Sequence, residues 1–205
     1  MKIVERSAEI ISVTKNPEKH IELCGGTCYK SEDNITEESS KNFINKLISM
    51  GHESVLEHAY ATFRVICDRS TSHQWVRHRI ASYSQESQRY CNYGKDKFEG
   101  VSFIIPYDLK DIYNFKCYLL MAEKEYLRMI DNGTPPEIAR SILPNCTKTE
   151  IVCTNNFRSW RNLLKERLSS GAQADIRILA ENVLEQLFIE APTVFGDIRR
   201  KYYER

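Results

Sequence analysis

The segment QWVRHRIASYSQESQRY, residues 74–90, is the most unusual stretch of this sequence. It carries three arginines and no apolar periodicity after Ile80, so it predicts neither a core element nor an ordinary amphipathic helix. Arg77 and Arg79 are two residues apart, and on an extended backbone their side chains would point to the same face. Two guanidinium groups side by side suit a pyrophosphate, because each can bind anionic oxygens through two hydrogen bonds. The segment therefore predicts an anion-binding site.

The remaining polar residues of this segment suit an anion and a planar ring. Hydroxyl donors and a further guanidinium follow in its second half: Ser82, Ser84, Ser87 and Arg89. The rings of Tyr83 and Tyr90 can cover a planar group. The Gln74 amide both donates and accepts, so it suits a pyrimidine edge, although a residue on a helix surface is an equally good interpretation. A lone Arg-His-Arg cluster would instead favour a basic surface loop that forms salt bridges.

Length and composition restrict the class of protein. The 205 residues fit one domain, or two tightly joined halves, and are enough to bury a real core. The net charge of +1 argues against a protein that binds polyanions through bulk electrostatics. No apolar leader and no run of membrane-spanning length are visible, so we expect no membrane partner. Seven scattered cysteines without a secretion signal favour a reduced, cytoplasmic location.

The histidines and cysteines do not predict a metal site. Cys24 and Cys28 would need a second pair at similar spacing, and none follows. In HESVLEH the two histidines, His52 and His58, are six residues apart, whereas the zinc protease motif places them four apart on one helix face. We therefore expect no metal.

Hydrophobic periodicity predicts a mixture of strands and helices. Strands are expected in residues 2–13, 58–67 and 146–154, the second with strict alternation. Helices are expected over 36–50, from a Ser70–Ser72 cap to Trp75, and over 108–132, 134–144, 155–168 and 174–191, where Pro192 ends the last. Residues 24–29, CGGTCY, predict a turn. The expected buried stripes include Met50 in the first helix and Ile112 and Leu120 in the long one.

Four stretches together resemble a known family. The run RHRIASYSQESQRY (77–90) closely resembles the signature of the flavin-dependent thymidylate synthases. GHESVLEH (51–58), TPPEIARSILP (134–144) and NNFRSWRNLLKER (155–167) resemble further blocks of the same family, and the matches extend from about Gly51 to Arg177. The resemblance implies an α+β fold, a mixed or antiparallel sheet flanked by helices, in a single domain over 1–205. It also implies a homotetramer with sites between subunits.

The resemblance implies a role for each matching position. Contacts to FAD are implied for Ser54, Arg77, His78, Arg79, Gln85, Asn156, Phe157, Arg158 and Asn162. Contacts to dUMP are implied for Gln74, Trp75, Val76, Arg77, Gln85, Glu86, Ser87, Gln88, Arg89, Arg140 and Arg167. Arg167 is further implied to be catalytic, as the residue that activates the pyrimidine. The sequence has no Gly-x-Gly-x-x-Gly, which excludes the usual dinucleotide fingerprint.

The implied reaction is the methylation of dUMP to dTMP. The carbon comes from 5,10-methylenetetrahydrofolate, and the hydride comes from FAD that NADPH has reduced. Hydride addition to the uracil ring places negative charge on its N3/O4 side, which suits a permanently protonated guanidinium. No cysteine follows a proline, the context in which conventional thymidylate synthases carry their nucleophile.

Two other functions remain open from the residues alone. The arginines and rings of residues 75–90 could contact single-stranded nucleic acid, although such proteins usually have a wider basic surface. The chain could also be a flavin- or nucleotide-binding oxidoreductase with another substrate. Flavin colour in the purified protein favours an enzyme, and salt-sensitive retention on single-stranded DNA favours the binding protein. We expect the enzyme, and no nucleic-acid partner.

Overall fold

The computed structural model describes residues 1–28, 30, 35–36 and 38–204. These residues form two compact units that alternate along the chain. Unit 1 comprises Met1–Ser7, Val65–Arg77 and Ser84–Ile151, and unit 2 comprises Ala8–Arg64, His78–Tyr83 and Val152–Arg205. A single domain over 1–205 stays a prediction. Tyr29 of the predicted turn and Glu37 of the predicted helix start lie outside the described residues.

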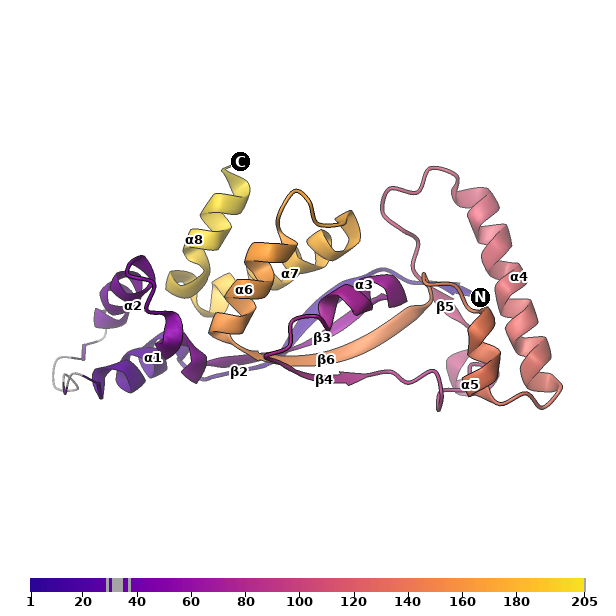
Figure 1. The fold of residues 1–205 in the computed structure, drawn as a ribbon, viewed down its shortest axis with the longest axis horizontal. Helices are drawn as coiled ribbons and strands as arrows, with labels where there is room; N and C mark the ends of the chain where they lie inside the picture. Colours follow the sequence, from indigo (N-terminus) through magenta and orange to yellow (C-terminus); the bar gives the residue numbers. More distant parts are fainter. Residues whose placement is uncertain (29, 31–34, 37, 205) are drawn as a thin grey trace. The chain divides into compact units, whose positions relative to one another are not determined.

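The strands form two sheets (Figure 1). The four-stranded antiparallel sheet has the order β2-β3-β6-β4, formed by Ser7–Val13, Tyr60–Asp68, Lys148–Asn156 and Ser82–Gln85. In the smaller sheet β1 (Lys2–Ile3) pairs in parallel with β5 (Ser102–Phe103). Strand β3 buries the face that its alternation predicted: Ala61, Phe63, Val65 and Cys67 are at most 1% exposed. The predicted α+β class is confirmed.

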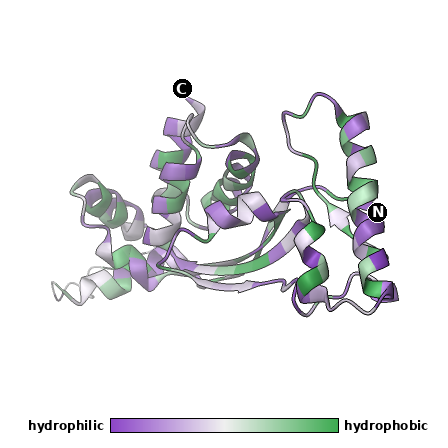
Figure 2. Ribbon diagram, turned by 45° about the vertical axis from the view of Figure 1, so that its right-hand side comes forward, coloured by the Kyte–Doolittle hydropathy of each residue, from purple (hydrophilic) through white to green (hydrophobic). Residues whose placement is uncertain are grey.

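Unit 2 contains most of the helices. They are α1 (Pro17–Gly26), α2 (Ser39–Ser49), the 3-10 turn η2 (Glu53–His58), α6 (Phe157–Arg167), α7 (Ala174–Glu190) and α8 (Pro192–Tyr203). Apolar side chains recur along α6 and bury one face, on which Trp160 donates from Nε1 to the Ala61 carbonyl at 3.0 Å. Its ring meets Phe63 edge-on at 5.1 Å. This packing fixes the helix that carries Arg158, Asn162 and Arg167. In Figure 2 the helices have a hydrophilic side (purple) and a hydrophobic side (green).

Unit 1 contains α3 (Arg69–Trp75), η3 (Asp96–Phe98), α4 (Ile112–Asp131), α5 (Pro136–Ala139) and η4 (Arg140–Ile142). Its core gathers the buried side chains of Tyr93, Val101, Phe103, Leu119 and Tyr126. The predicted stop of α4 at Gly133 is confirmed, because this residue has φ +82°, a left-handed conformation that glycine adopts without strain. Pro136 then begins α5 in its first turn, as predicted.

Several local predictions are wrong for identifiable reasons. The turn predicted over 24–29 is confirmed only for Thr27 and Cys28, because α1 continues to Gly26. At Gly25 a Cβ would lie 2.5 Å from Cζ of Phe43, so a larger residue there would require the Phe43 ring to move. Pro192 does more than end a helix: it occupies the first turn of α8, which the sequence did not predict.

Other errors concern caps and burial. Asp68, not a serine, caps α3: its carboxylate accepts from the Thr71 backbone nitrogen at 2.8 Å. Met50, Ile112 and Leu120 were expected to be buried but are 46%, 43% and 50% exposed. Met50 is the cap residue after α2 and Ile112 is the first residue of α4, so both lie at helix ends, whereas Leu120 follows the buried Leu119 and points away from it. Trp75 is fully buried, although its segment was predicted to contribute nothing to the core.

Candidate functional site

The end of α3 supplies the first predicted site residues of unit 1. Gln74 and Val76 are half-buried beside the fully buried Trp75, so the tryptophan anchors the helix rather than facing a ligand. Arg77 lies in the turn after α3, not on a strand, and its side chain is exposed. Among the described residues no carboxylate pairs with Arg77. Its charge therefore faces solvent.

The amide of Gln85 is held in one orientation by two buried hydroxyl groups. Its Nε2 donates to Ser72 Oγ and to Thr149 Oγ1, each at 3.1 Å. Ser72 and Thr149 are at most 1% exposed. Within the described part of the chain nothing donates to the Gln85 Oε1. The fold thus presents a fixed acceptor, which a ring N–H of a ligand could use.

Glu86 is tied into the structure by both carboxylate oxygens. Its Oε1 accepts from the Tyr93 hydroxyl and its Oε2 from Lys148 Nζ, both at 2.8 Å. Burial lowers the pKa of Lys148, but the hydrogen bond and charge of Glu86 outweigh it and raise that pKa overall. Burial, then the Glu86 charge, raises the pKa of Tyr93. Glu86 therefore fixes the backbone that follows β4.

Arg89 and Arg140, 51 positions apart in the sequence, converge on one residue of α5. Arg89 Nε lies 3.4 Å from the carboxylate oxygen of Glu137, and Arg140 Nε donates to the Glu137 backbone carbonyl at 3.2 Å. Ser87 lies beside Arg89, with its hydroxyl oxygen 3.3 Å from the Arg89 backbone nitrogen. The Arg89 guanidinium also covers the Tyr90 ring at 5.3 Å. Two of the predicted dUMP-binding arginines thus contact the same residue, one at its carboxylate and one at its backbone carbonyl, whereas Gln88 is buried.

In unit 2 the structure joins His78 to Arg167. Arg167 Nε donates to His78 Nε2 at 3.0 Å, and the Tyr83 hydroxyl donates to the His78 carbonyl at 2.7 Å. Burial, and then the positive charge of Arg167, lower the pKa of His78, while Glu166 acts in the opposite direction. A predicted cofactor residue and the predicted catalytic residue are therefore direct neighbours.

The other predicted flavin contacts of unit 2 differ in accessibility. Asn156 caps α6 by accepting from the Ser159 nitrogen at 2.8 Å, and the Phe157 ring is buried edge-on against Phe195 at 5.2 Å. These two residues position α6. Four accessible side chains remain: Ser54, Arg79, Arg158 and Asn162. Arg158 pairs with Glu57 at 2.6 Å, whereas Arg79 has no ion-pair partner among the described residues.

The sequence did not predict the contacts of Glu137 or the ion-pair cluster of the buried Arg161. The spacing of Glu137 and Arg140 gave no signal for this contact, because Arg140 reaches the Glu137 backbone carbonyl, whereas the Glu137 carboxylate contacts Arg89, 48 positions away in the sequence. Arg161, only 1% exposed, pairs with Asp197 at 2.7 Å and with Glu53 at 3.1 Å. Nothing in its helix distinguished this arginine from its solvated neighbours.

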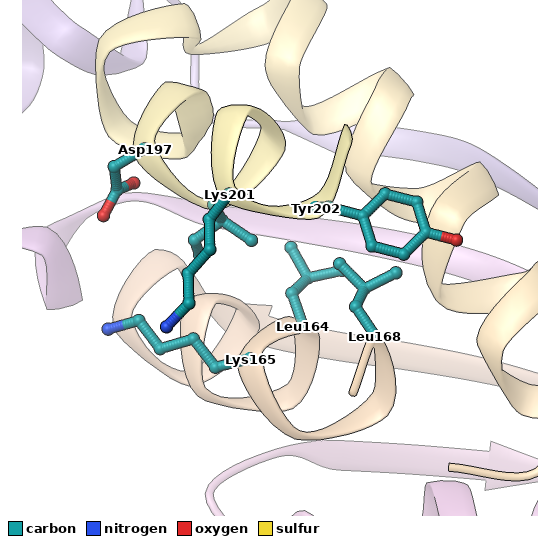
Figure 3. A pocket seen from close by; sticks show the side chains of 7 residues that line it. Leu164, Lys165, Leu168, Asp197, Lys201 and Tyr202 are labelled. Carbon is teal, nitrogen blue, oxygen red and sulfur yellow. The ribbon is translucent and has the colours of Figure 1, made fainter. Parts of the chain in front are cut away.

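A cavity of about 160 Å³ lies between α6 and α8 (Figure 3). Leu164, Leu168 and Tyr202 line it with Lys165, Lys201, Asp197 and Ile198. None of these residues was predicted to bind a ligand. No group of three metal-ligating side chains is gathered anywhere in the described ranges, and no described helix is long and apolar enough to cross a membrane.

The family model of the thymidylate synthase complementing protein matches residues 9–193. A flavin-dependent thymidylate synthase of Geobacter sulfurreducens is 38% identical over 199 residues, covering 92% of this chain and 84% of the relative. The chain belongs to the flavin-dependent thymidylate synthase family. Its predicted family and enzyme class, a methyltransferase of dTMP biosynthesis and a flavoprotein, are thereby confirmed.

Other relatives carry the same name. The flavin-dependent thymidylate synthases of Corynebacterium efficiens and Pyrococcus furiosus are 35% and 36% identical, each match covering 87% of this chain and 78% and 77% of the relative. A solved UMP/dUMP methylase from Streptomyces cacaoi, bound with 5-Br dUMP, has a TM-score of 0.82 at 21% identity and covers 96% of both chains. This last similarity is one of fold.

Proposed function

We propose that this chain is an FAD-dependent thymidylate synthase that methylates dUMP to dTMP. In this reaction 5,10-methylenetetrahydrofolate gives the carbon and NADPH the reducing equivalents, and the enzyme works as a homotetramer. Family membership supports the type of reaction. The observation that supports a phosphorylated substrate is that Arg89 and Arg140 both contact one residue, Glu137, and that Arg89 does so at its carboxylate, an anion that a phosphate can replace.

The proposed contacts to dUMP follow from the accessible donors and acceptors. Arg89, Arg140 and the Ser87 hydroxyl bind the phosphate, which displaces the weak, solvent-exposed contact between Arg89 and the Glu137 carboxylate. The fixed Gln85 Oε1 accepts from a ring N–H. Four other residues predicted to contact dUMP have side chains that are buried, half-buried or already hydrogen-bonded, so they support the site without binding the ligand directly: Trp75, Val76, Glu86 and Gln88.

The residues of unit 2 fit a flavin dinucleotide. Arg79 is exposed and lacks an ion-pair partner within the described residues, which suits an anionic pyrophosphate. Arg158, Asn162 and Ser54 add accessible donors, and Asn156 retains its amide N–H donors. Phe157 can contribute only its backbone, because its ring is in the core. When bound, reduced FAD supplies the hydride for the uracil ring.

Arg167 stabilises the charge that develops on the pyrimidine. A guanidinium is always protonated and donates from several N–H groups, so it can hold negative charge on the N3/O4 side of the ring. The proposed reaction uses no cysteine nucleophile. Burial raises the pKa of Cys67 to about 12 and that of Cys146 to about 11, which disfavours their thiolates.

Arg89→Ala is expected to weaken dUMP binding by about 10- to 100-fold, the effect of losing one charged hydrogen-bonding partner. Isothermal titration with dUMP measures this loss. Binding of deoxyuridine, which lacks the phosphate, should not change. Arg128→Ala is the matched control, because Arg128 is an exposed arginine that pairs with Glu125 elsewhere in unit 1. Equal losses for dUMP and deoxyuridine would argue against phosphate binding by Arg89 and against this proposal.

Arg79→Ala is expected to reduce the amount of FAD that stays with the protein. The physical reason is the loss of an exposed positive charge that faces the proposed pyrophosphate. Flavin absorbance per chain after gel filtration measures the retention. Arg200→Ala, which removes an exposed arginine of α8, should retain flavin like the natural protein. Unchanged flavin content in Arg79→Ala would remove this residue from the cofactor site.

A further inference from the structure

The contact between Arg167 and His78 fixes the protonation state of the imidazole. An arginine Nε carries one hydrogen and no lone pair that can accept, so in the 3.0 Å contact it must be the donor. His78 Nε2 must then be the acceptor and cannot carry a hydrogen. The ring is therefore neutral, with its hydrogen on Nδ1.

The surroundings of His78 support the same form. The Tyr83 hydroxyl holds the His78 backbone through its carbonyl at 2.7 Å, which restricts where the ring can lie. The charged groups that act on the half-buried ring both come from α6: Arg167 disfavours a proton and Glu166 favours one. Burial adds to the effect of Arg167, and together they lower the pKa of His78 below its ordinary value of 6.5. The ring stays a neutral acceptor at neutral pH.

We propose that His78 is the positioning residue of Arg167 and holds its guanidinium only while the imidazole is neutral. Accepting the Nε–H fixes the plane of the guanidinium, and the N–H groups on Nη1 and Nη2, which this bond does not use, act on the pyrimidine. Protonation of His78 removes the acceptor and places a second positive charge beside Arg167. The arginine then loses its orientation, and catalysis falls on the acid side. This inference rests on the proposed role of Arg167.

A purely structural role of His78 predicts different behaviour. A histidine that only packs would change the unfolding temperature when replaced, but it would leave the pH dependence of catalysis where it was. A positioning histidine instead makes the pH profile of kcat/KM, which reports groups of the free enzyme, follow its own titration. Replacement of a positioning histidine also lowers kcat far more than it changes the KM for dUMP.

The test compares His78→Gln and His78→Leu with the natural enzyme between about pH 5 and pH 8, where histidines titrate. The natural enzyme should lose kcat/KM as the pH falls below 6.5, because the lowered pKa of His78 lies under that value. In His78→Gln the amide Oε1 replaces Nε2 as an acceptor that does not titrate, so we expect substantial activity and no acid loss. In His78→Leu the side chain offers no acceptor, so kcat should fall by about 10-fold or more. The matched control is His73→Gln, which changes an exposed histidine of α3 and should keep the natural profile.

Nitrogen NMR of the FAD-loaded protein gives a readout that needs no turnover. A neutral ring with the hydrogen on Nδ1, whose protonation midpoint coincides with the kinetic acid loss, supports the inference. An Nε2–H ring, or a His78→Gln enzyme that keeps the natural acid loss, overturns it. An enzyme that makes no dTMP at any pH would instead contradict the proposed function, and the NMR tautomer would still decide whether His78 accepts from Arg167.

Discussion

Arg167→Ala should lower the rate of dTMP formation by about 10²- to 10³-fold, while dUMP and flavin binding persist. A preorganised donor that faces developing charge contributes about 3–4 kcal/mol to lowering a barrier, and water cannot replace it, because it must first reorient. In this chain the guanidinium is preorganised by His78 at 3.0 Å. Single-turnover formation of dTMP measures the loss without interference from product release.

Two further variants test whether the loss of rate is specific to the guanidinium of Arg167. Arg167→Lys keeps the charge but lacks the fork and the Nε–H that His78 accepts, so it should recover only a small part of the rate. Arg200→Ala, which removes an exposed arginine of α8, should leave the rate unchanged. Full activity in Arg167→Ala would exclude this residue from the chemistry.

Arg161→Ala is expected to destabilise unit 2 by about 1.5–3 kcal/mol, the usual contribution of charged hydrogen bonds, because the buried guanidinium is lost while its partner Asp197 is itself 47% exposed. The guanidinium is 1% exposed and donates to both oxygens of Asp197, at 2.7 and 2.8 Å, and to Glu53 at 3.1 Å. It also donates to the Val194 carbonyl, so one side chain ties η2, α6 and α8 together. Urea unfolding of the flavin-free protein measures the change in free energy of unfolding.

The control for this experiment lies one helix turn away. Arg158 pairs with Glu57 at 2.6 Å, but the two side chains are about half-exposed, so Arg158→Ala should cost at most about 1 kcal/mol. Arg161→Met, which fills the space without a charge, should cost less than Arg161→Ala. Equal, small effects of Arg161→Ala and Arg158→Ala would contradict the assigned role of the buried cluster.

The same cluster gives stability a pH dependence with a definite sign. Burial raises the pKa of Glu53 and of Asp197, but the bonds and charge of Arg161 outweigh it, so both pKa values lie below their ordinary values of 4.5 and 3.8. The unfolded chain then binds more protons than the folded one in that range. The stabilisation is present above the ordinary values and is lost as the pH falls through the lowered ones. Arg161→Met should therefore lose less stability on acidification than the natural protein.

Local patterns in the sequence were enough to predict many of the strands and helices. The alternation of residues 58–67 predicted β3 and its buried face, because side chains alternate between the two faces of any strand. The helix that carries Arg167 was predicted to within two residues at either end, since its apolar positions recur at helical spacing. The helix α8 was missed, because a proline signals either the end of one helix or the first turn of the next.

The pairing of charged side chains could not be predicted in the same way. His78 and Arg167 are 89 positions apart, and only the packed chain brings them within 3.0 Å. Arg161 and Arg158 are three residues apart on one helix, yet the first is buried and the second is exposed. Which arginines of a helix are buried depends on what packs against it, and that information lies in η2 and α8.

The central claim is that this chain transfers a methylene carbon to dUMP with the help of a flavin. Its most direct test is mass-spectrometric detection of dTMP after incubation of the purified protein with dUMP, 5,10-methylenetetrahydrofolate and NADPH, with FAD present or stripped away. We predict that dTMP forms only in the complete mixture and disappears when FAD or any of the three substrates is omitted. No dTMP from the flavin-loaded protein, or equal dTMP without FAD, would contradict the claim.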